Sequence, residues 1–121
     1  MKVIQFVASA KHAEALAFYR DVMGFTLVED SPFAIEFDAA GTMLRVQKVP
    51  EFAPQPFTAI GWQVDDIASA RDALAAKGAE FLTFPHFEQD ERQIWTTPDG
   101  TKVCWFHDAD GNTLSLTEFA G

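Results

Sequence analysis

The side chains that most often carry chemistry are few and widely separated in this sequence. The three histidines, His12, His86 and His107, are too scattered along the chain to have the spacing of a zinc site. Cys104 lies in a strand-like segment with no basic neighbour, so we expect a buried and inert thiol. As the single cysteine, it has no partner for an intrachain disulfide.

Two acidic segments could hold a cation, but their patterns favour a structural role. Asp108 and Asp110 resemble the acids of a calcium loop, yet the rest of that loop pattern is missing, so we expect turn formers. His86 lies in an acidic loop at residues 85–91, which we interpret as solvated, with a weak cation site as the alternative. No phosphate-binding loop, dinucleotide fingerprint or nucleophile elbow is present.

Composition excludes several classes of protein. A chain of 121 residues with 48% hydrophobic and 22% charged residues predicts one folded domain rather than a disordered chain. No apolar run approaches the roughly 20 residues of a membrane span, and the first residues lack the features of a signal peptide. We therefore expect a cytoplasmic protein. The net charge of −9 disfavours nucleic acid as a partner, and it suits solubility or a cationic ligand.

Hydrophobic periodicity predicts the same order of elements twice. Ser9 is a candidate cap for the first helix, and Asp65 or Asp66 for the second; Gly24 and Gly78 are expected to end them. The first half is predicted to contain a strand at 2–8, a helix at 11–23, and strands at 25–28, 33–37 and 42–49. The second half is predicted to contain a strand at 57–64, the second helix, and strands at 79–84, 93–97, 102–107 and 113–119.

The predicted order is βαβββ, a linker, and βαβββ with one extra hairpin. Similar turns at 38–41 and 108–111 precede alternating strands in both copies, which indicates a duplicated module. Three prolines within residues 50–56 indicate the linker. We predict a single α+β domain with module one at 1–49, the linker at 50–56 and module two at 57–121.

Three segments together resemble the vicinal oxygen chelate superfamily, which includes glyoxalase I, extradiol dioxygenases, and fosfomycin- and bleomycin-resistance proteins. The segments are FYRDVMGF at 18–25, GWQVDDI at 61–67 and FHDADGNTLSL at 106–116. The resemblance covers essentially the whole chain. It implies two tandem βαβββ modules that form a curved, half-barrel mixed sheet around a cavity, often within a homodimer.

The resemblance also implies where a metal would bind. In metal-dependent members, the first and last strands of each module provide one ligand each. The matching positions are Ile4 or Gln5, Arg45, Ala59 and Ser115. Only Gln5 is a usual ligand, and zinc or iron needs at least three protein ligands. The sequence is therefore most similar to the metal-free, bleomycin-resistance-like members, and no cofactor is expected; a divalent metal is the alternative.

Strand alternation predicts which side chains face the cavity. Leu44, Val46, Leu114 and Leu116 are expected to pack under the helices. If Arg45 faces inward, it needs an acidic partner or an anionic ligand group, because an unpaired buried guanidinium is costly. The predicted ligand-binding residues are Gln5, Phe33, Phe37, Arg45, Gln47, Gln63, Trp95, Trp105, His107 and Ser115.

These observations leave three hypotheses for function. The favoured one is a metal-independent homodimer that binds an aromatic or cationic small molecule in the concave cavity, as the resemblance to bleomycin-resistance proteins implies. The alternative is a divergent metal-dependent lyase, isomerase or dioxygenase of the glyoxalase type, which would use Gln5 with Glu118, His107 or the acidic loop. The third is a module for association alone, with a cavity filled by aromatic side chains. Whether the protein is an enzyme is left open, and neither nucleic acid nor a membrane is expected as a partner.

Overall fold

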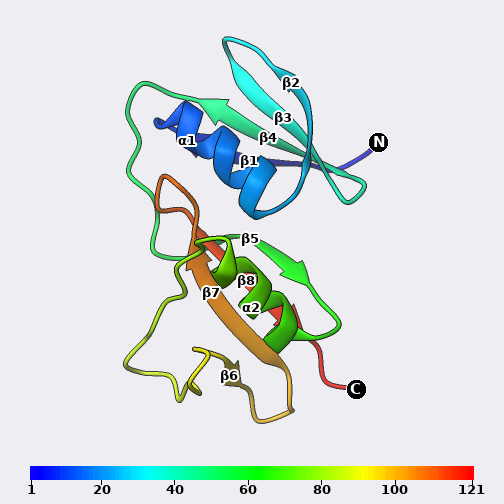
Figure 1. Ribbon diagram of the computed structural model, residues 1–121, viewed down its shortest axis with the longest axis vertical. Helices are drawn as coiled ribbons and strands as arrows, with labels where there is room; N and C mark the ends of the chain where they lie inside the picture. The colour runs from blue at the N-terminus through cyan, green and yellow to red at the C-terminus, as the bar shows by residue number, and fades with distance from the viewer. The chain divides into compact units, whose positions relative to one another are not determined.

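The computed structural model describes residues 1–121 as two units, each with one four-stranded mixed sheet and few helices (Figure 1). The first unit contains Met1–Pro54 and Asp108–Asn112, and the second contains Gln55–His107 and Thr113–Gly121. This is the predicted α+β fold of two repeated modules. No helix is both long enough and apolar enough to cross a membrane.

The first unit has its strands in the order β1-β4-β3-β2. β1 pairs with β4 in parallel, and the other two pairs are antiparallel. Gly24, with φ of +75°, follows the helical segment in the left-handed conformation predicted for it. The elements are β1 (Ile4–Ser9), α1 (His12–Ala17), a π-helical turn η1 (Phe18–Val22), β2 (Thr26–Asp30), β3 (Ala34–Ala39) and β4 (Thr42–Lys48).

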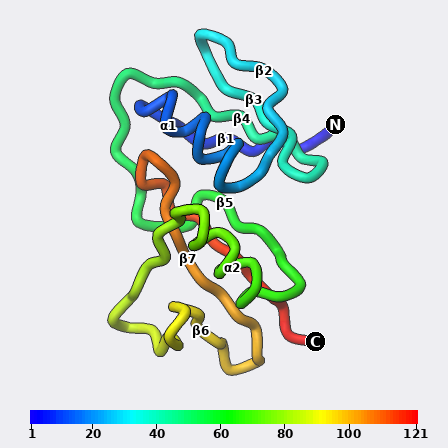
Figure 2. The backbone as a smooth tube through the Cα atoms, viewed as in Figure 1, coloured from blue at the N-terminus to red at the C-terminus, as the bar shows by residue number.

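The second unit repeats this topology with the strand order β5-β8-β7-β6. Its elements are β5 (Thr58–Gln63), α2 (Ile67–Ala76), β6 (Trp95–Thr96), β7 (Lys102–His107) and β8 (Thr113–Glu118). The predicted strand at 79–84 is wrong: only Phe81 forms a bridge, with Phe106, and the chain then runs irregularly to β6 (Figure 2).

The core of the first unit lies on the sheet face that carries Leu44 and Val46, as predicted. Both side chains are 1% exposed, and Phe37 is fully buried opposite Leu44. The Tyr19 ring lies 5.9 Å from the Phe37 ring, so the helical segment packs on this face. Burial of these apolar side chains is the main source of the unit's stability.

The turn at 108–112 forms hydrogen bonds with the residues just before α1. Asp110 accepts hydrogen bonds from the Ser9 hydroxyl (2.5 Å) and from the backbone N–H groups of Ala10 (2.8 Å) and Lys11 (3.0 Å). Ser9 in turn accepts from the Lys11 N–H at 3.1 Å. The prediction of Ser9 as the cap is wrong, because the helix starts later: its N-cap residue is Lys11, which forms no side-chain cap hydrogen bond. Asp108 accepts from the Tyr19 hydroxyl at 2.6 Å and from the backbone N–H of Asp110 and Asn112.

The core of the second unit lies under α2. Leu114 and Leu116 are buried as predicted, together with Ile67, Cys104 and Phe106. Asp66 caps α2 by accepting from the Ser69 N–H at 3.1 Å, which confirms one of the two predicted caps. Glu118 accepts from the Ile67 N–H at 3.0 Å and so also serves the start of this helix.

Candidate functional site

The face of the second sheet that points away from its core carries all five residues predicted there. Trp105 lies opposite Ser115, and Ser115 lies opposite Gly61, in one row across β7, β8 and β5. Register places the other predicted residues on this same face, because paired residues project to the same side. The five are Gln63, Trp95, Trp105, His107 and Ser115.

The centre of this row is built from small residues. A Cβ atom placed on Gly61 would lie 2.8 Å from the Ser115 hydroxyl oxygen. A larger residue at position 61 would therefore clash with the Ser115 side chain. Trp105 lies beside Ser115 and provides a large ring next to these small residues. Its indole N–H donates to the Thr58 hydroxyl at 3.2 Å, which holds the ring in place.

A pocket of about 270 Å³ opens beside Trp105, and we refer to it as the aromatic pocket. This volume is slightly below the usual range for drug-sized ligands, so it suits a smaller molecule. None of its lining residues is Asp, Glu, Lys or Arg. The lining residues are Pro56, Phe57, Thr58, Phe84, His86, Phe87, Trp105 and Thr113.

The rings around the pocket are mutually stacked. Phe87 is parallel to Trp105, with 5.2 Å between centroids and 6° between planes, and it also stacks on Trp95 at 4.4 Å. Phe84 meets Trp105 edge-on at 5.3 Å. The sequence analysis missed Phe84 and Phe87 and interpreted His86 as a solvated loop residue. The signal was present in the run of three ring side chains at residues 84–87.

In the first unit, Arg45 projects from the sheet face opposite the core. It forms an ion pair with Glu36, directly across β3 and β4, and Glu29 lies opposite Glu36 on β2. Glu36 is the acidic partner that an inward Arg45 was predicted to need. Gln47 lies on the same face and is exposed. With two carboxylates and one guanidinium, this row is net negative.

The other predicted residues of the first unit lie elsewhere. The prediction that Phe37 faces the cavity is wrong, because it is fully buried against Tyr19 on the core face. Gln5 pairs with Leu44 and so lies on that core-facing side, away from Arg45. Phe33 precedes β3 and is 74% exposed, so strand alternation does not place it on either face.

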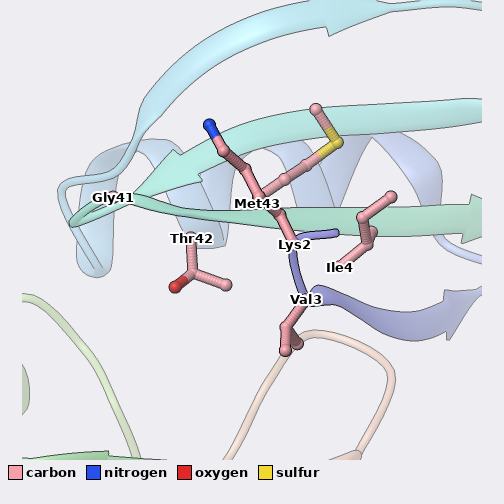
Figure 3. Close-up of a pocket in the computed structure, with 6 residues that line it drawn as sticks. All are labelled: Lys2, Val3, Ile4, Gly41, Thr42 and Met43. Carbon is pink, nitrogen blue, oxygen red and sulfur yellow. The ribbon is translucent and has the colours of Figure 1, made fainter.

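The first unit has a larger hollow of about 820 Å³ near the start of the chain (Figure 3). Ile4 and Met43 line it and share the Arg45 face. The lining also includes Lys2, Val3, Gly41 and Thr42, all of which are exposed. Because this lining contains no aromatic ring, the aromatic pocket is the stronger candidate site for an aromatic or cationic molecule.

The residues at the expected metal positions do not form a ligand set. Arg45 is a cation held by Glu36, Ala59 lies at an irregularity in β5, and Ile4 has no donor atom. No group of three or more His, Cys, Asp and Glu side chains is placed to hold a metal ion. Glu118 and His107, which were suggested as alternative metal ligands, project from opposite faces of the second sheet.

Cys104 is a core residue, as predicted. It is fully buried, and burial raises the pKa of its thiol to about 12. The thiol is therefore protonated at neutral pH, and it faces away from Trp105 and Ser115.

Comparison with known proteins agrees with the fold. The sequence model of the Glyoxalase/Bleomycin resistance protein/Dioxygenase superfamily matches residues 5–116. No curated protein matches the sequence. A superfamily member from Sphaerobacter thermophilus is similar with a TM-score of 0.76 and 22% identity, covering 98% of this chain and 97% of that one.

Two further solved structures have names that point to different functions. TioX from Micromonospora sp. ML1 has a TM-score of 0.75 at 17% identity, with 99% of both chains covered. Lactoylglutathione lyase from Agrobacterium tumefaciens has a TM-score of 0.71 at 18% identity, covering 98% of this chain and 92% of that one. At these identities the likeness establishes the fold alone.

Proposed function

We propose that this chain, which belongs to the Glyoxalase/Bleomycin resistance protein/Dioxygenase superfamily, binds a small aromatic or cationic molecule without using a metal ion. The observation that carries the proposal is the aromatic pocket. It combines stacked rings with a few polar groups, the hydroxyls of Thr58 and Thr113 and the imidazole of His86. Apolar walls with a few polar groups are typical of small-molecule sites.

Charge supports a cationic ligand over an anionic one. The pocket is lined by the rings of Phe84, Phe87 and Trp105, whose faces carry partial negative charge, and by no lysine or arginine. Such faces attract cations, by about 0.5–2 kcal/mol for a well-placed contact. The net charge of −9 attracts cations at longer range. Arg45 does not oppose this preference, because Glu36 neutralises it.

The positions of the possible metal ligands support binding over metal-dependent catalysis. A divergent lyase or dioxygenase would need at least three protein ligands on one site. Glu118 accepts from the start of α2 on the core face of the second sheet, whereas His107 projects from the other face. The two side chains therefore cannot share one ion on this sheet. Metal analysis of protein purified without chelator tests this point, and stoichiometric nickel, zinc, iron or manganese would overturn the proposal.

Equilibrium dialysis with a matched pair of probes tests the binding site. N-methylquinolinium and quinoline have the same flat ring system, and at pH 8 only the first is charged. We expect both to bind, with the cation tighter. Trp105→Leu removes the largest ring of the pocket and should weaken binding by roughly 10- to 100-fold, equivalent to about 1.5–3 kcal/mol.

Phe119→Leu is the matched control, because Phe119 is 62% exposed and does not line the pocket. It should leave both affinities unchanged. If neither probe binds, or if both variants bind like the wild type, the aromatic pocket is not the site. The homodimer stays a proposal, and light scattering on purified protein tests it.

A further inference from the structure

The wall that carries Phe84, His86 and Phe87 is an irregular segment between α2 and β6 (Figure 2). We refer to residues 82–93 as the strap. Its backbone forms no helix, and its only bridge pairs Gln89 with Trp95. The strap therefore lacks the repeated hydrogen bonds that hold a strand in place, and its shape must depend on other contacts.

One side chain provides three of these contacts. The Gln89 side-chain oxygen accepts from the Phe84 N–H at 2.7 Å. Its amide nitrogen donates to the carbonyl oxygens of Leu82 at 3.0 Å and Gln93 at 2.8 Å. Gln89 thus joins both ends of the strap, and one of its bonds is made to the backbone of a pocket residue.

A second side chain fixes the far end of the strap to the helix. Arg71 of α2 donates to the Gln93 side-chain oxygen at 2.6 Å and to the Arg92 carbonyl at 3.1 Å. Its guanidinium lies over the Phe81 ring, 5.0 Å from the ring centre. A continuous set of contacts therefore runs from α2 through Gln93 and Gln89 to Phe84.

We propose that Gln89 is the positioning residue of the aromatic pocket and that it restricts the pocket to flat ring systems. The inference rests on the proposed function. With the strap in this conformation, Phe87 lies parallel to Trp105 and Phe84 stands edge-on to it, so the pocket beside Trp105 is lined by rings held at fixed angles, which match a flat ligand better than a globular one. A wall ordered before binding also lowers the entropy cost of binding a flat ligand.

Gln89→Met tests this role, because methionine is similar in size and cannot form the three hydrogen bonds. Two singly charged cations of different shape are compared by equilibrium dialysis: flat N-methylquinolinium and globular N-methylquinuclidinium. In the wild type we expect a preference for the flat cation. In Gln89→Met that preference should fall by about tenfold or more. The near-ultraviolet circular dichroism of the stacked Phe87 and tryptophan rings should weaken without any ligand.

Glu88→Gln is the control, since Glu88 is an exposed neighbour on the same strap. It should keep both the preference and the spectrum of the wild type. Arg71→Lys keeps the charge but loses the forked set of N–H donors. It should lower the preference for the flat cation and weaken the near-ultraviolet spectrum, each by less than Gln89→Met does. This variant carries the test if Gln89→Met does not fold.

The outcomes separate the two proposals. A variant that is less heat-stable but keeps the flat-ring preference and the spectrum refutes the positioning role while the proposed function stands. A wild type that binds neither cation refutes the proposed function and the specificity assigned to Gln89. The unliganded spectrum then decides whether Gln89 orders the strap.

Discussion

Replacing Tyr19 with phenylalanine removes one buried hydroxyl that donates a hydrogen bond to a buried carboxylate. That hydroxyl donates to Asp108 at 2.6 Å. Tyr19 is fully buried and Asp108 is 7% exposed, so water cannot easily take the place of the lost donor. Asp108 keeps three other donors, the N–H groups of Asp110 and Asn112 and the Asn112 side-chain amide.

The expected cost follows from this geometry. Hydrogen bonds to charged groups contribute about 1.5–3 kcal/mol, and a buried carboxylate that loses a partner bears a desolvation penalty. Because three donors remain, we expect Tyr19→Phe to lower the free energy of unfolding by about 2 kcal/mol. Denaturant unfolding should show a lower midpoint with an unchanged slope, since the surface exposed on unfolding is the same.

The same pair predicts how this cost changes with pH. Burial, together with the charge of Asp108, raises the pKa of the Tyr19 phenol well above its ordinary value of 10.0. Above about pH 10 the unfolded chain releases the phenol proton while the folded chain retains it, so the wild type loses stability as pH rises. Tyr19→Phe lacks this loss, and the difference between the two proteins should shrink above pH 10.

Tyr19 is the only tyrosine, so phenolate absorbance reports on it directly. The phenolate should appear only at the pH at which alkali unfolds the protein. Two results would refute the reasoning: a change in unfolding free energy below about 0.5 kcal/mol, or phenolate formation in folded protein near pH 10. Either would mean that water reaches the pair.

Three further predictions concern single sites. Asp110→Ala should cost about 1–2 kcal/mol in denaturant unfolding, because the segment before α1 loses three hydrogen bonds. An unchanged midpoint would show that the hydrogen bond from the Lys11 N–H to Ser9 is sufficient to hold this segment. Arg45→Met should cost about 1–2 kcal/mol, since Glu36 is left facing Glu29. The double variant Arg45→Met/Glu36→Gln should recover most of that loss, and a double variant less stable than the single one would contradict this. Cys104 should resist a thiol reagent in the folded protein and react once per chain in denaturant, because burial keeps it inaccessible and raises its pKa to about 12.

Sequence periodicity predicted most of the elements but not the strap. β7 matches the prediction at both ends, and β4 and β8 differ by one residue at one end. Residues 79–84 alternate like a strand, yet only Phe81 forms a bridge. The Leu82 N–H still bonds to β7, but the Gln89 side chain takes the Leu82 carbonyl and the Phe84 N–H, which a neighbouring strand would otherwise use. A side chain that bonds to backbone five to seven residues away leaves no periodic signal.

The error at Phe37 has a geometric cause. The strands after the two turns align with a shift of 70 residues, as Leu44 and Leu114 do, and that shift matches Phe37 to His107. The structure pairs Phe37 with Leu44 and Phe106 with Leu114, so β3 matches β7 with a shift of 69 residues. The two hairpin loops differ in length, and a slip of one residue moves every side chain of a strand to the other face.

With this alignment, the two modules place different chemistry at equivalent positions. Arg45 and Glu36 of the first sheet correspond to Ser115 and Trp105 of the second. Arg45 and Glu36 form an ion pair between two strands, so their charges cancel. Ser115 and Trp105 place a small hydroxyl next to a large ring. The aromatic pocket lies beside Trp105 of the second pair, next to rings provided by the strap. Duplication therefore explains the scaffold, and the difference between these two pairs explains why the candidate binding site belongs to the second module.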